Sequence, residues 1–409
     1  MNRDTDREPL RRMLWRLVAI IPILGVVTFA AFTYRVATDT GGVKSHLEVA
    51  VDYSDFHAAA WTLRFGEADQ LYDVAALAAV ESDLRGEPVP AKPSYLNPPA
   101  FAMLLFALAP LGYLVGYVIW TTLGLFVFGI SLRLLGVARP WLVTAIAALS
   151  TVGLVGLRIG QGQMYWAAVF GAVLWRLRGS AHVQAGLFAV LLSLKPQLLA
   201  PFVLWWLIDW RTYWRVLLTT GIGSAVLAVL PAVLFPGSYD GYFSLLRDTS
   251  ASALQEGIPW GATLPYTVFA MAGRSVTSAT VTFVVSNLLF AGLVFFAVRA
   301  RWSRDTMFVV VTVGAAALAN HLLLYDWMIL VPAGVVVSQH LPDFSVYLPG
   351  MIAALMYVSL LQMVFGIETY RQFGFVPQIA PVLLIGVGVV AVRQMVEPTT
   401  RSFAPTGGG

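Results

Sequence analysis

The chain has 409 residues, of which 58% are hydrophobic and 12% are charged. Ordinary soluble domains carry about 25% charged residues, and a bilayer accommodates this much apolar surface where a soluble core does not. The net charge of +4 is spread in small groups, which argues against a nucleic-acid-binding patch, and the absence of cysteine excludes disulfides, thiolate metal sites and cysteine nucleophiles. We therefore predict an all-α polytopic membrane protein.

Continuous apolar stretches separated by charges predict about twelve transmembrane helices. They lie near residues 14–34, 112–134, 140–157, 163–177, 182–194, 197–209, 216–235, 276–298, 305–320, 325–340, 345–364 and 376–393. No small-residue cleavage site follows the first stretch, so we expect a retained helix and not a signal peptide. The predicted organisation is a cytoplasmic N-terminus at 1–13, one transmembrane domain at 14–394 and a disordered cytoplasmic tail at 395–409.

Arginine pairs and triplets recur in the short loops on one side of this layout. They include Arg133 with Arg139, Arg176 with Arg178, and Arg211 with Arg215. Because short cytoplasmic loops are rich in Lys and Arg, both termini are predicted to be cytoplasmic. The long loops 35–98 and 236–275 then lie outside the cytoplasm. Loops of that length are often functional, so we expect the chemistry on that side.

The first long loop contains "DYSDFHAAAWTLRF", which opens with Asp52 and Asp55. Its apolar residues recur at helical spacing, which indicates an amphipathic helix on the outer membrane surface. Asp55 is expected at the start of that helix, where an aspartate either caps the N-terminus or stands at the bilayer surface as a general base. Asp52 is a second acid or a metal partner, although two carboxylates without further ligands are a weak metal signal.

Two later segments add polar residues at the predicted outer boundary. The residues "NPP" at 97–99 precede an apolar run that is too short to cross a bilayer, which predicts a re-entrant or interfacial helix or an ordinary helix start. The segment "GLRIGQGQMYW" then places Arg158, Gln161 and Gln163 between two apolar stretches. A tight connector accounts for its glycines, whereas the arginine and the two amides point to a ligand.

Lys195 lies in the apolar run "LLSLKPQLLAPF" beside a helix-breaking proline. A lysine at membrane depth costs a few kcal/mol unless it is paired, extends to the interface or lines a water-filled cavity. Lys195 therefore either reaches the outer interface or pairs with an anion such as a phosphate. His321 and Tyr325 are four residues apart in "NHLLLYDWM". His321 is either a structural histidine or an imidazole that binds phosphate or moves a proton.

These residues suit a lipid-linked phosphosugar, with cations for the phosphate, amides and aromatic rings for the sugar, and a base for the acceptor hydroxyl. The sequence has no Gly-rich nucleotide loop and no paired DxD acids, which argues against a nucleotide-sugar donor. A lipid flippase or secondary transporter is the main alternative, and a non-catalytic assembly protein is another. Transporters commonly have duplicated halves, and no duplication is visible here.

The sequence resembles the bacterial integral-membrane GT-C glycosyltransferases of family 87, which use polyprenyl-phosphate mannose and include the mycobacterial phosphatidylinositol mannoside mannosyltransferases. The resemblance rests on "SDFHAAAWTLRFGEADQLYD", "YLNPPAFAMLLFALAPLG", "GQGQMYWAAVFGAVLWRLRG", "LLSLKPQLLAPFVLWW" and "HLLLYDWMILVPA", in that order over residues 14–335. It implies a GT-C fold in the bacterial plasma membrane and an inverting transfer of mannose to a glycolipid, in an α-1,2 linkage, outside the cytoplasm. Arabinose or another polyprenyl-linked sugar is the alternative donor.

The resemblance also assigns roles to single residues. The catalytic aspartate of the family falls on Asp55, its Lys-Pro element on Lys195 and its histidine on His321, and we expect Lys195, His321 and Arg158 to bind the donor phosphate. The Gly-Gln element falls on Gln163, and Met164 stands where the family often has asparagine.

The remaining expectations concern the sugars and the partners. We assign sugar or acceptor contacts to five residues: Gln163, Gln161, Asn97, Tyr325 and Asp52. No metal or other cofactor is expected. The expected partners are polyprenyl-phosphate mannose, a glycolipid acceptor and membrane lipids, and no nucleic acid.

Overall fold

The computed structural model describes residues 50–92, 95–247, 263–272, 275–319, 322–341 and 379–396, together with residues 23, 26, 27 and 372. The predicted crossings at 14–34 and 345–364, the N-terminal segment 1–13 and His321 lie outside this part of the chain, apart from the three single residues in the first crossing. The described residues form helices, and no strand is among them. The prediction of an all-α protein is confirmed for this part.

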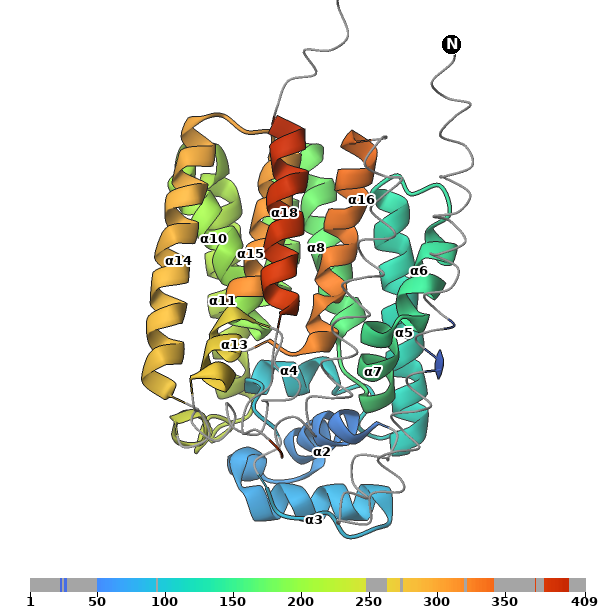
Figure 1. The fold of residues 1–409 in the computed structure, drawn as a ribbon. Coiled ribbons are helices and arrows are strands. Elements are labelled where there is room, and N and C mark those ends of the chain that lie inside the picture. The colour runs from blue at the N-terminus through green and yellow to red at the C-terminus, as the bar shows by residue number, and fades with distance from the viewer. Residues whose placement is uncertain are drawn as a thin grey trace, which may run out of the picture.

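Long helices form an upright bundle, and shorter helices cover one of its ends (Figure 1). The covering layer contains α2 (Val51–Phe65), η2 (Ala68–Tyr72), α3 (Val74–Arg85) and α4 (Pro99–Leu104). In the view of Figure 1, α2 lies between α3 and the bundle. Residues 50–92 of the loop predicted at 35–98 therefore fold into helices that cap the bundle.

Three helices of the described chain are long and apolar enough to cross a membrane: α5 (Tyr113–Leu134), α11 (Trp210–Leu234) and α14 (Val276–Arg299). A fourth span arises if α6 (Pro140–Leu149) and α7 (Thr151–Ile159), which meet at a bend of 76°, are counted together. On α14, Leu288 and Leu289 are exposed, whereas Phe290 and Val294 are buried. Exposed leucines of this kind suit contact with lipid, because lipid tails are as apolar as leucine.

The rest of the bundle consists of shorter helices. They are α8 (Gln163–Arg178), α9 (His182–Val190), η3 (Leu191–Leu194), α10 (Pro196–Ile208), α15 (Arg304–Leu318), η4 (Leu324–Ile329), α16 (Leu330–His340) and α18 (Ala380–Val396), with α13 (Leu264–Met271) beside α14. The predicted break at Lys195 is confirmed: η3 ends at Leu194, and Pro196 is the first residue of α10. Proline at that position costs no hydrogen bond, because the first amides of a helix have no partner within it.

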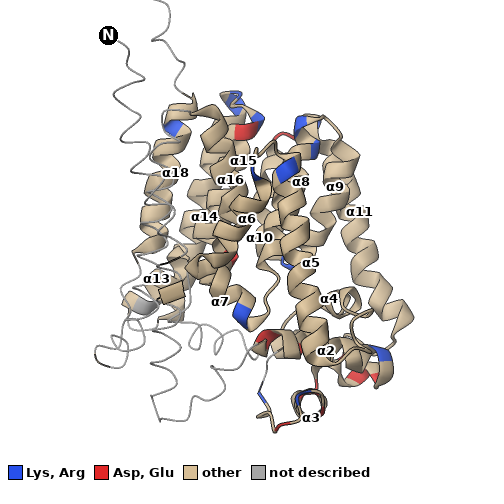
Figure 2. Cartoon of the chain, turned by 90° about the vertical axis from the view of Figure 1, so that its right-hand side faces the viewer, with Lys and Arg blue, Asp and Glu red and all other residues tan. Residues whose placement is uncertain are grey.

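Figure 2 shows that most Lys and Arg of the bundle gather at the end opposite α2 and α3. One of them, Arg178 of α8, donates to both carboxylate oxygens of Asp305 on α15, at 3.0 and 2.6 Å. The same guanidinium donates to Gln339 of α16 at 3.0 Å, and Gln339 donates to the carbonyl oxygen of Leu135 at the end of α5, at 2.7 Å. Polar bonds thus join four helices at this end.

The helix that carries the two aspartates differs from the sequence expectation in two ways. α2 begins at Val51 with Ala50 as its N-cap, so Asp55 lies in the second turn and the N-cap interpretation of Asp55 is wrong. The helix also packs against α3, α4, α5 and α7, and residues from Tyr53 to Ala60 are all buried. A surface helix with one apolar face was expected. Instead, α3 packs against the polar residues of α2, and Ser54 of α2 donates to Glu81 of α3 at 2.5 Å.

Candidate functional site

The start of α2 is held against the turn between α7 and α8. The backbone amide of Ala50 donates to the carbonyl oxygen of Arg158 at 2.6 Å. Gly160, in the turn, has a φ of +84°, and a Cβ placed on it would lie 2.4 Å from the Cβ of Tyr53. The indole of Trp120 donates to the Gly160 carbonyl oxygen at 3.1 Å. Close approach of the two backbones therefore depends on a residue without a side chain.

Replacing Gly160 by alanine is expected to separate α2 from this turn. The added methyl group meets Tyr53, and the left-handed backbone adds about 1–2 kcal/mol of strain. We expect a fall in thermal stability, measured by the melting temperature in detergent. Gly86→Ala is the matched control, because Gly86 has a φ of +72° with nothing within 4 Å of the added atom. Equal effects of the two variants would show that the backbone strain alone is responsible.

Asp52 faces this turn. Its carboxylate accepts a hydrogen bond from the side-chain amide of Gln161, so two residues that are predicted to contact sugar or acceptor contact each other. Burial raises the pKa of Asp52, and the Gln161 hydrogen bond, Lys92 and Lys195 oppose that shift. Lys195, at the break between η3 and α10, is thus one of the charges that lower the pKa of Asp52. Asp55 lies three residues further along α2 and is buried.

The raised pKa of Asp52 predicts a pH-dependent effect on stability. A carboxyl whose pKa rises on folding destabilises the folded state as the pH increases from its ordinary value of 3.8 through the raised value. Asp52→Asn keeps an oxygen for Gln161 and removes this ionisation. We expect the variant to melt at a higher temperature than the parent at pH 7, with a difference that shrinks towards pH 4. A difference in melting temperature that does not change with pH would contradict a raised pKa of Asp52.

Lys195 has a partner within the chain. Its ammonium forms an ion pair with the carboxylate of Asp326, and the two side chains are 16% and 2% exposed. The other oxygen of Asp326 accepts from the amide of Leu323 at 3.2 Å. The ammonium also lies 5.6 Å from the centre of the Tyr325 ring. From the sequence, Lys195 was predicted either to reach the outer interface or to pair with an anion such as a phosphate. No role was predicted for Asp326.

Two residues that sequence analysis did not select are buried carboxylates beside the site. Asp326 is the partner of Lys195, and the available signal was the rule that a lysine at membrane depth needs a counter-charge. Glu81 is 3% exposed, accepts from Ser54 of α2 and lies 3.2 Å from Arg85 in an ion pair. The spacing of Glu81 and Arg85, one helical turn apart, was visible in the sequence. Glu81 therefore joins α3 to α2.

Gln163 is the first residue of α8 and is 1% exposed. In the amide orientation that satisfies both of its polar atoms, it donates to the Gln161 carbonyl oxygen at 2.6 Å and accepts from the Leu157 amide at 3.0 Å. These bonds brace the turn between α7 and α8. The proposed sugar contact of Gln163 stays a prediction.

The remaining predicted residues are spread around α2 and η4. Asn97 is half-buried before α4, and its carbonyl oxygen accepts from the Tyr72 hydroxyl at 2.7 Å. Arg158 is half-buried near the end of α7, and Tyr325 is buried in η4. The helix η4, which carries Tyr325 and Asp326, packs against both α7 and α8. The structure thus connects Asp52 with Gln161 by a hydrogen bond, and Lys195 with Asp326 by an ion pair beside the ring of Tyr325. Arg158 contacts the start of α2 through its backbone carbonyl oxygen, which accepts from the amide of Ala50.

A metal site was not expected from the sequence. Among the described residues, no group of three or more His, Cys, Asp or Glu side chains is arranged to hold a metal ion.

The fold and this site define a helical membrane protein with buried carboxylates, amides and one ion pair below a cap of helices. The sequence model of Glycosyltransferase family 87 matches residues 95–325, which is more than half of the chain. The chain belongs to this family, and membership implies a membrane glycosyltransferase. The matched region contains Gln161, Lys195 and Tyr325, whereas α2 with its two aspartates precedes it. No curated protein and no solved structure matches the chain.

Proposed function

We propose that the protein transfers mannose from polyprenyl-phosphate mannose to a glycolipid acceptor, with Asp55 as the general base. The acceptor in this proposal is a phosphatidylinositol mannoside that receives the sugar in an α-1,2 linkage. The observation that carries the proposal is the contact of α2 with the matched region: Asp55 is buried on α2, and Asp52, three residues earlier, accepts a hydrogen bond from Gln161. Family membership supplies the reaction class.

The reaction is a single displacement. The acceptor hydroxyl oxygen forms a bond to the anomeric carbon, the bond from that carbon to the phosphate oxygen breaks, and its electron pair leaves with the polyprenyl phosphate. Asp55 takes the hydroxyl proton, and attack from the opposite face converts a β-linked donor into an α-linked product. One carboxylate suffices, because the phosphate leaving group does not need the second carboxyl that protonates the leaving oxygen in glycoside hydrolases.

The charge at the phosphate decides the role of Lys195. A phosphodiester carries one negative charge, and the leaving polyprenyl phosphate gains a second, so a nearby cation stabilises the transition state more than the ground state. Asp326 already neutralises Lys195 in this structure. We therefore assign Arg158 and His321 as further cations of the phosphate site, with Asp326 as the residue that positions Lys195.

The site is proposed to face away from the cytoplasm of a bacterium, in the plasma membrane. About twelve crossings with both termini inside follow from the positive-inside rule. The gathering of Lys and Arg at the end of the bundle opposite α2 supports this orientation (Figure 2). Both substrates are lipids in this proposal. A base on α2, in the cap at one end of the bundle, then lies where their head groups leave the bilayer.

The test is transfer by the purified protein in liposomes that contain acceptor glycolipid and radiolabelled polyprenyl-phosphate mannose. We expect label in a product that has gained one hexose, identified by mass spectrometry. If the protein transfers sugar only from polyprenyl-phosphate arabinose, the proposed donor sugar is wrong and the proposed mechanism stands. Movement of the donor lipid between leaflets without any transfer would favour a flippase and reject the proposal.

A further inference from the structure

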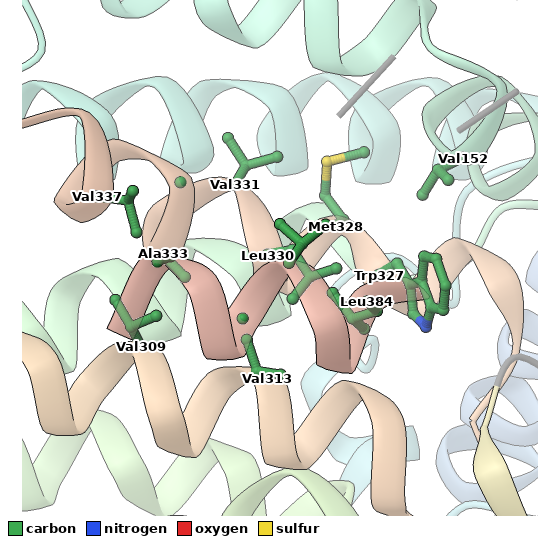
Figure 3. A pocket seen from close by; sticks show the side chains of 14 residues that line it. Val152, Val309, Val313, Trp327, Met328, Leu330, Val331, Ala333, Val337 and Leu384 are labelled. Atoms are coloured by element: carbon green, nitrogen blue, oxygen red, sulfur yellow. The ribbon is translucent and has the colours of Figure 1, made fainter. Parts of the chain in front are cut away.

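A polar pocket lies at the end of the bundle opposite the cap, between the start of α9 and the start of α11. It is lined by residues 180–184 and by Arg215, and its volume is about 230 Å³. That is the liquid volume of about eight water molecules, which leaves room for a phosphate group. The pocket among α15, α16 and α18 is of another kind, because its lining is apolar apart from the indole nitrogen of Trp327 (Figure 3).

The close packing of α9 against α11 positions the residues of the polar pocket. A Cβ on Gly186 of α9 would lie 2.8 Å from the Cβ of Thr219, and a Cβ on Gly223 of α11 would lie 2.3 Å from the side chain of Val190. Both pairs are separated by 33 residues in the chain, so the two helices run in the same direction with one register. The same offset places the first residue of α9 beside the second turn of α11.

The charge at the pocket is positive. No carboxylate in the described part of the chain forms an ion pair with Arg215, whose guanidinium lies 5.3 Å from the centre of the Trp214 ring. The charged groups that act on His182 are Arg215 and a second guanidinium, that of Arg304. Asp305, which follows Arg304 in the chain, is bonded to another arginine, Arg178 of α8.

Polar nitrogen atoms at this place also lack acceptors. Nε2 of His182 and Nε of Arg304 are buried and have no hydrogen-bond partner among the described residues, although buried polar atoms are usually paired. Asp209 acts on the neighbouring Tyr213 but forms no ion pair within the described residues. The guanidiniums of Arg215 and Arg304 thus outnumber the carboxylate, and a phosphodiester, with one negative charge, would balance the difference.

The surroundings of the pocket favour a lipid as the source of this anion. The helix α11 is long and apolar enough to cross a membrane, and Trp210 and Trp214 in its first two turns are 57% and 47% exposed. Exposed tryptophans at the end of a membrane helix are typical of the level of the lipid head groups. Leu218 and Ile222 follow at helical spacing and are exposed too, so hydrocarbon can lie along α11 next to the pocket. Basic pockets between membrane helices bind anionic head groups.

We propose that this pocket binds the phosphate of an anionic phospholipid from the surrounding leaflet, with Arg215 paired to the phosphate and the acyl chains along Leu218 and Ile222. This lipid is neither the donor nor the acceptor of the transfer reaction, because the pocket lies at the end of the bundle far from α2 (Figure 2). The site therefore does not depend on the proposed function.

The test is native mass spectrometry of the purified protein, titrated with phosphatidylglycerol or with phosphatidylcholine of the same acyl chains. We expect phosphatidylglycerol to bind more tightly, and Arg215→Gln to weaken its binding at least about tenfold, since a hydrogen bond to a charged group has that effect. Arg211→Gln is the matched control. Arg211 is exposed one turn earlier on the same helix and does not line the pocket, so this variant loses the same charge and should keep its affinity.

Ser180 offers a second pair of variants. It lines the pocket with a φ of +54°, a left-handed conformation that asparagine and aspartate adopt more readily than other side chains. Ser180→Asp places a negative charge in the pocket and should weaken the binding of phosphatidylglycerol, whereas Ser180→Asn has nearly the same shape without the charge and should bind normally.

Three results would overturn the proposal: equal binding of the two phospholipids, equal losses in the Arg215 and Arg211 variants, or equal losses in the two Ser180 variants. Inorganic phosphate should not displace phosphatidylglycerol at an equal concentration. Displacement would identify a site for free phosphate and reject the lipid. Lipid binding is measured without transfer, so a failed transfer assay with normal lipid binding would reject only the proposed function.

Discussion

Asp55→Asn is expected to abolish sugar transfer and to leave the fold intact. Asparagine has nearly the same shape as aspartate but does not accept the proton of the acceptor hydroxyl at neutral pH. General base catalysis contributes about 10²–10⁴-fold, so turnover should fall by at least that range. The measurement is transfer by the purified variant in liposomes, with its melting temperature compared with that of the parent protein.

Asp52→Asn is the matched control, because it removes the neighbouring carboxylate of the same helix and keeps an oxygen for Gln161. We expect it to keep the base and therefore to lose less transfer than Asp55→Asn, with its loss seen as a raised KM for the acceptor. Near-normal turnover of the Asp55 variant would remove this residue from the role of base. A loss restricted to Asp52→Asn would move that role to Asp52.

The second large effect concerns the ion pair between Lys195 and Asp326. Lys195→Met leaves the Asp326 carboxylate, which is 2% exposed, without its counter-charge. Breaking a buried ion pair from one side costs about 3–5 kcal/mol, so the melting temperature of the single variant should fall strongly. The double variant Lys195→Met with Asp326→Asn has no buried charge and keeps an oxygen for the Leu323 amide. It should recover most of this stability.

Donor binding separates the two functions of Lys195. If the ammonium binds the donor phosphate, the restored double variant still has a raised KM for the donor and a lowered kcat, and its KM for the acceptor is unchanged. Recovery of normal donor kinetics together with stability would show that the pair is structural only. Recovery of stability without recovery of donor kinetics would thus indicate a phosphate site, whereas recovery of both would indicate a structural ion pair.

Most bundle helices among the described residues, and the break at Lys195, were predicted, because long apolar runs and a proline are local signals. The count of twelve crossings stays a prediction. The sequence did not predict the bend at Ser150, where the crossing expected at 140–157 divides into α6 and α7. The side chain of Ser150 accepts from the amide of Gly153 at 3.1 Å and caps α7. A Cβ on Gly153 would lie 2.1 Å from the Ala147 carbonyl oxygen, so the bend requires glycine there. One serine and one glycine in an apolar run were too weak a signal.

Contacts between distant residues explain the other differences. The start of α2 depends on Ala50, which has a φ of +66° and donates to Arg158, more than a hundred residues away in the chain. The pairing of Lys195 with Asp326 spans a similar distance. Residue types and local spacing identified Lys195 as a candidate, but only the folded chain, in which Lys195 pairs with Asp326 of η4, identifies its partner. The matched family region likewise does not extend to Asp55.

The bonds around Arg178 have a mechanical consequence. They connect α8, α15, α16 and the end of α5 at the end of the bundle far from α2. The cap end is joined separately, because Trp120 of α5 donates to the carbonyl oxygen of Gly160, in the turn between α7 and α8, at 3.1 Å. Different bonds therefore hold the two ends of these helices, so a substitution at Arg178 should loosen the far end and leave the geometry around α2 in place.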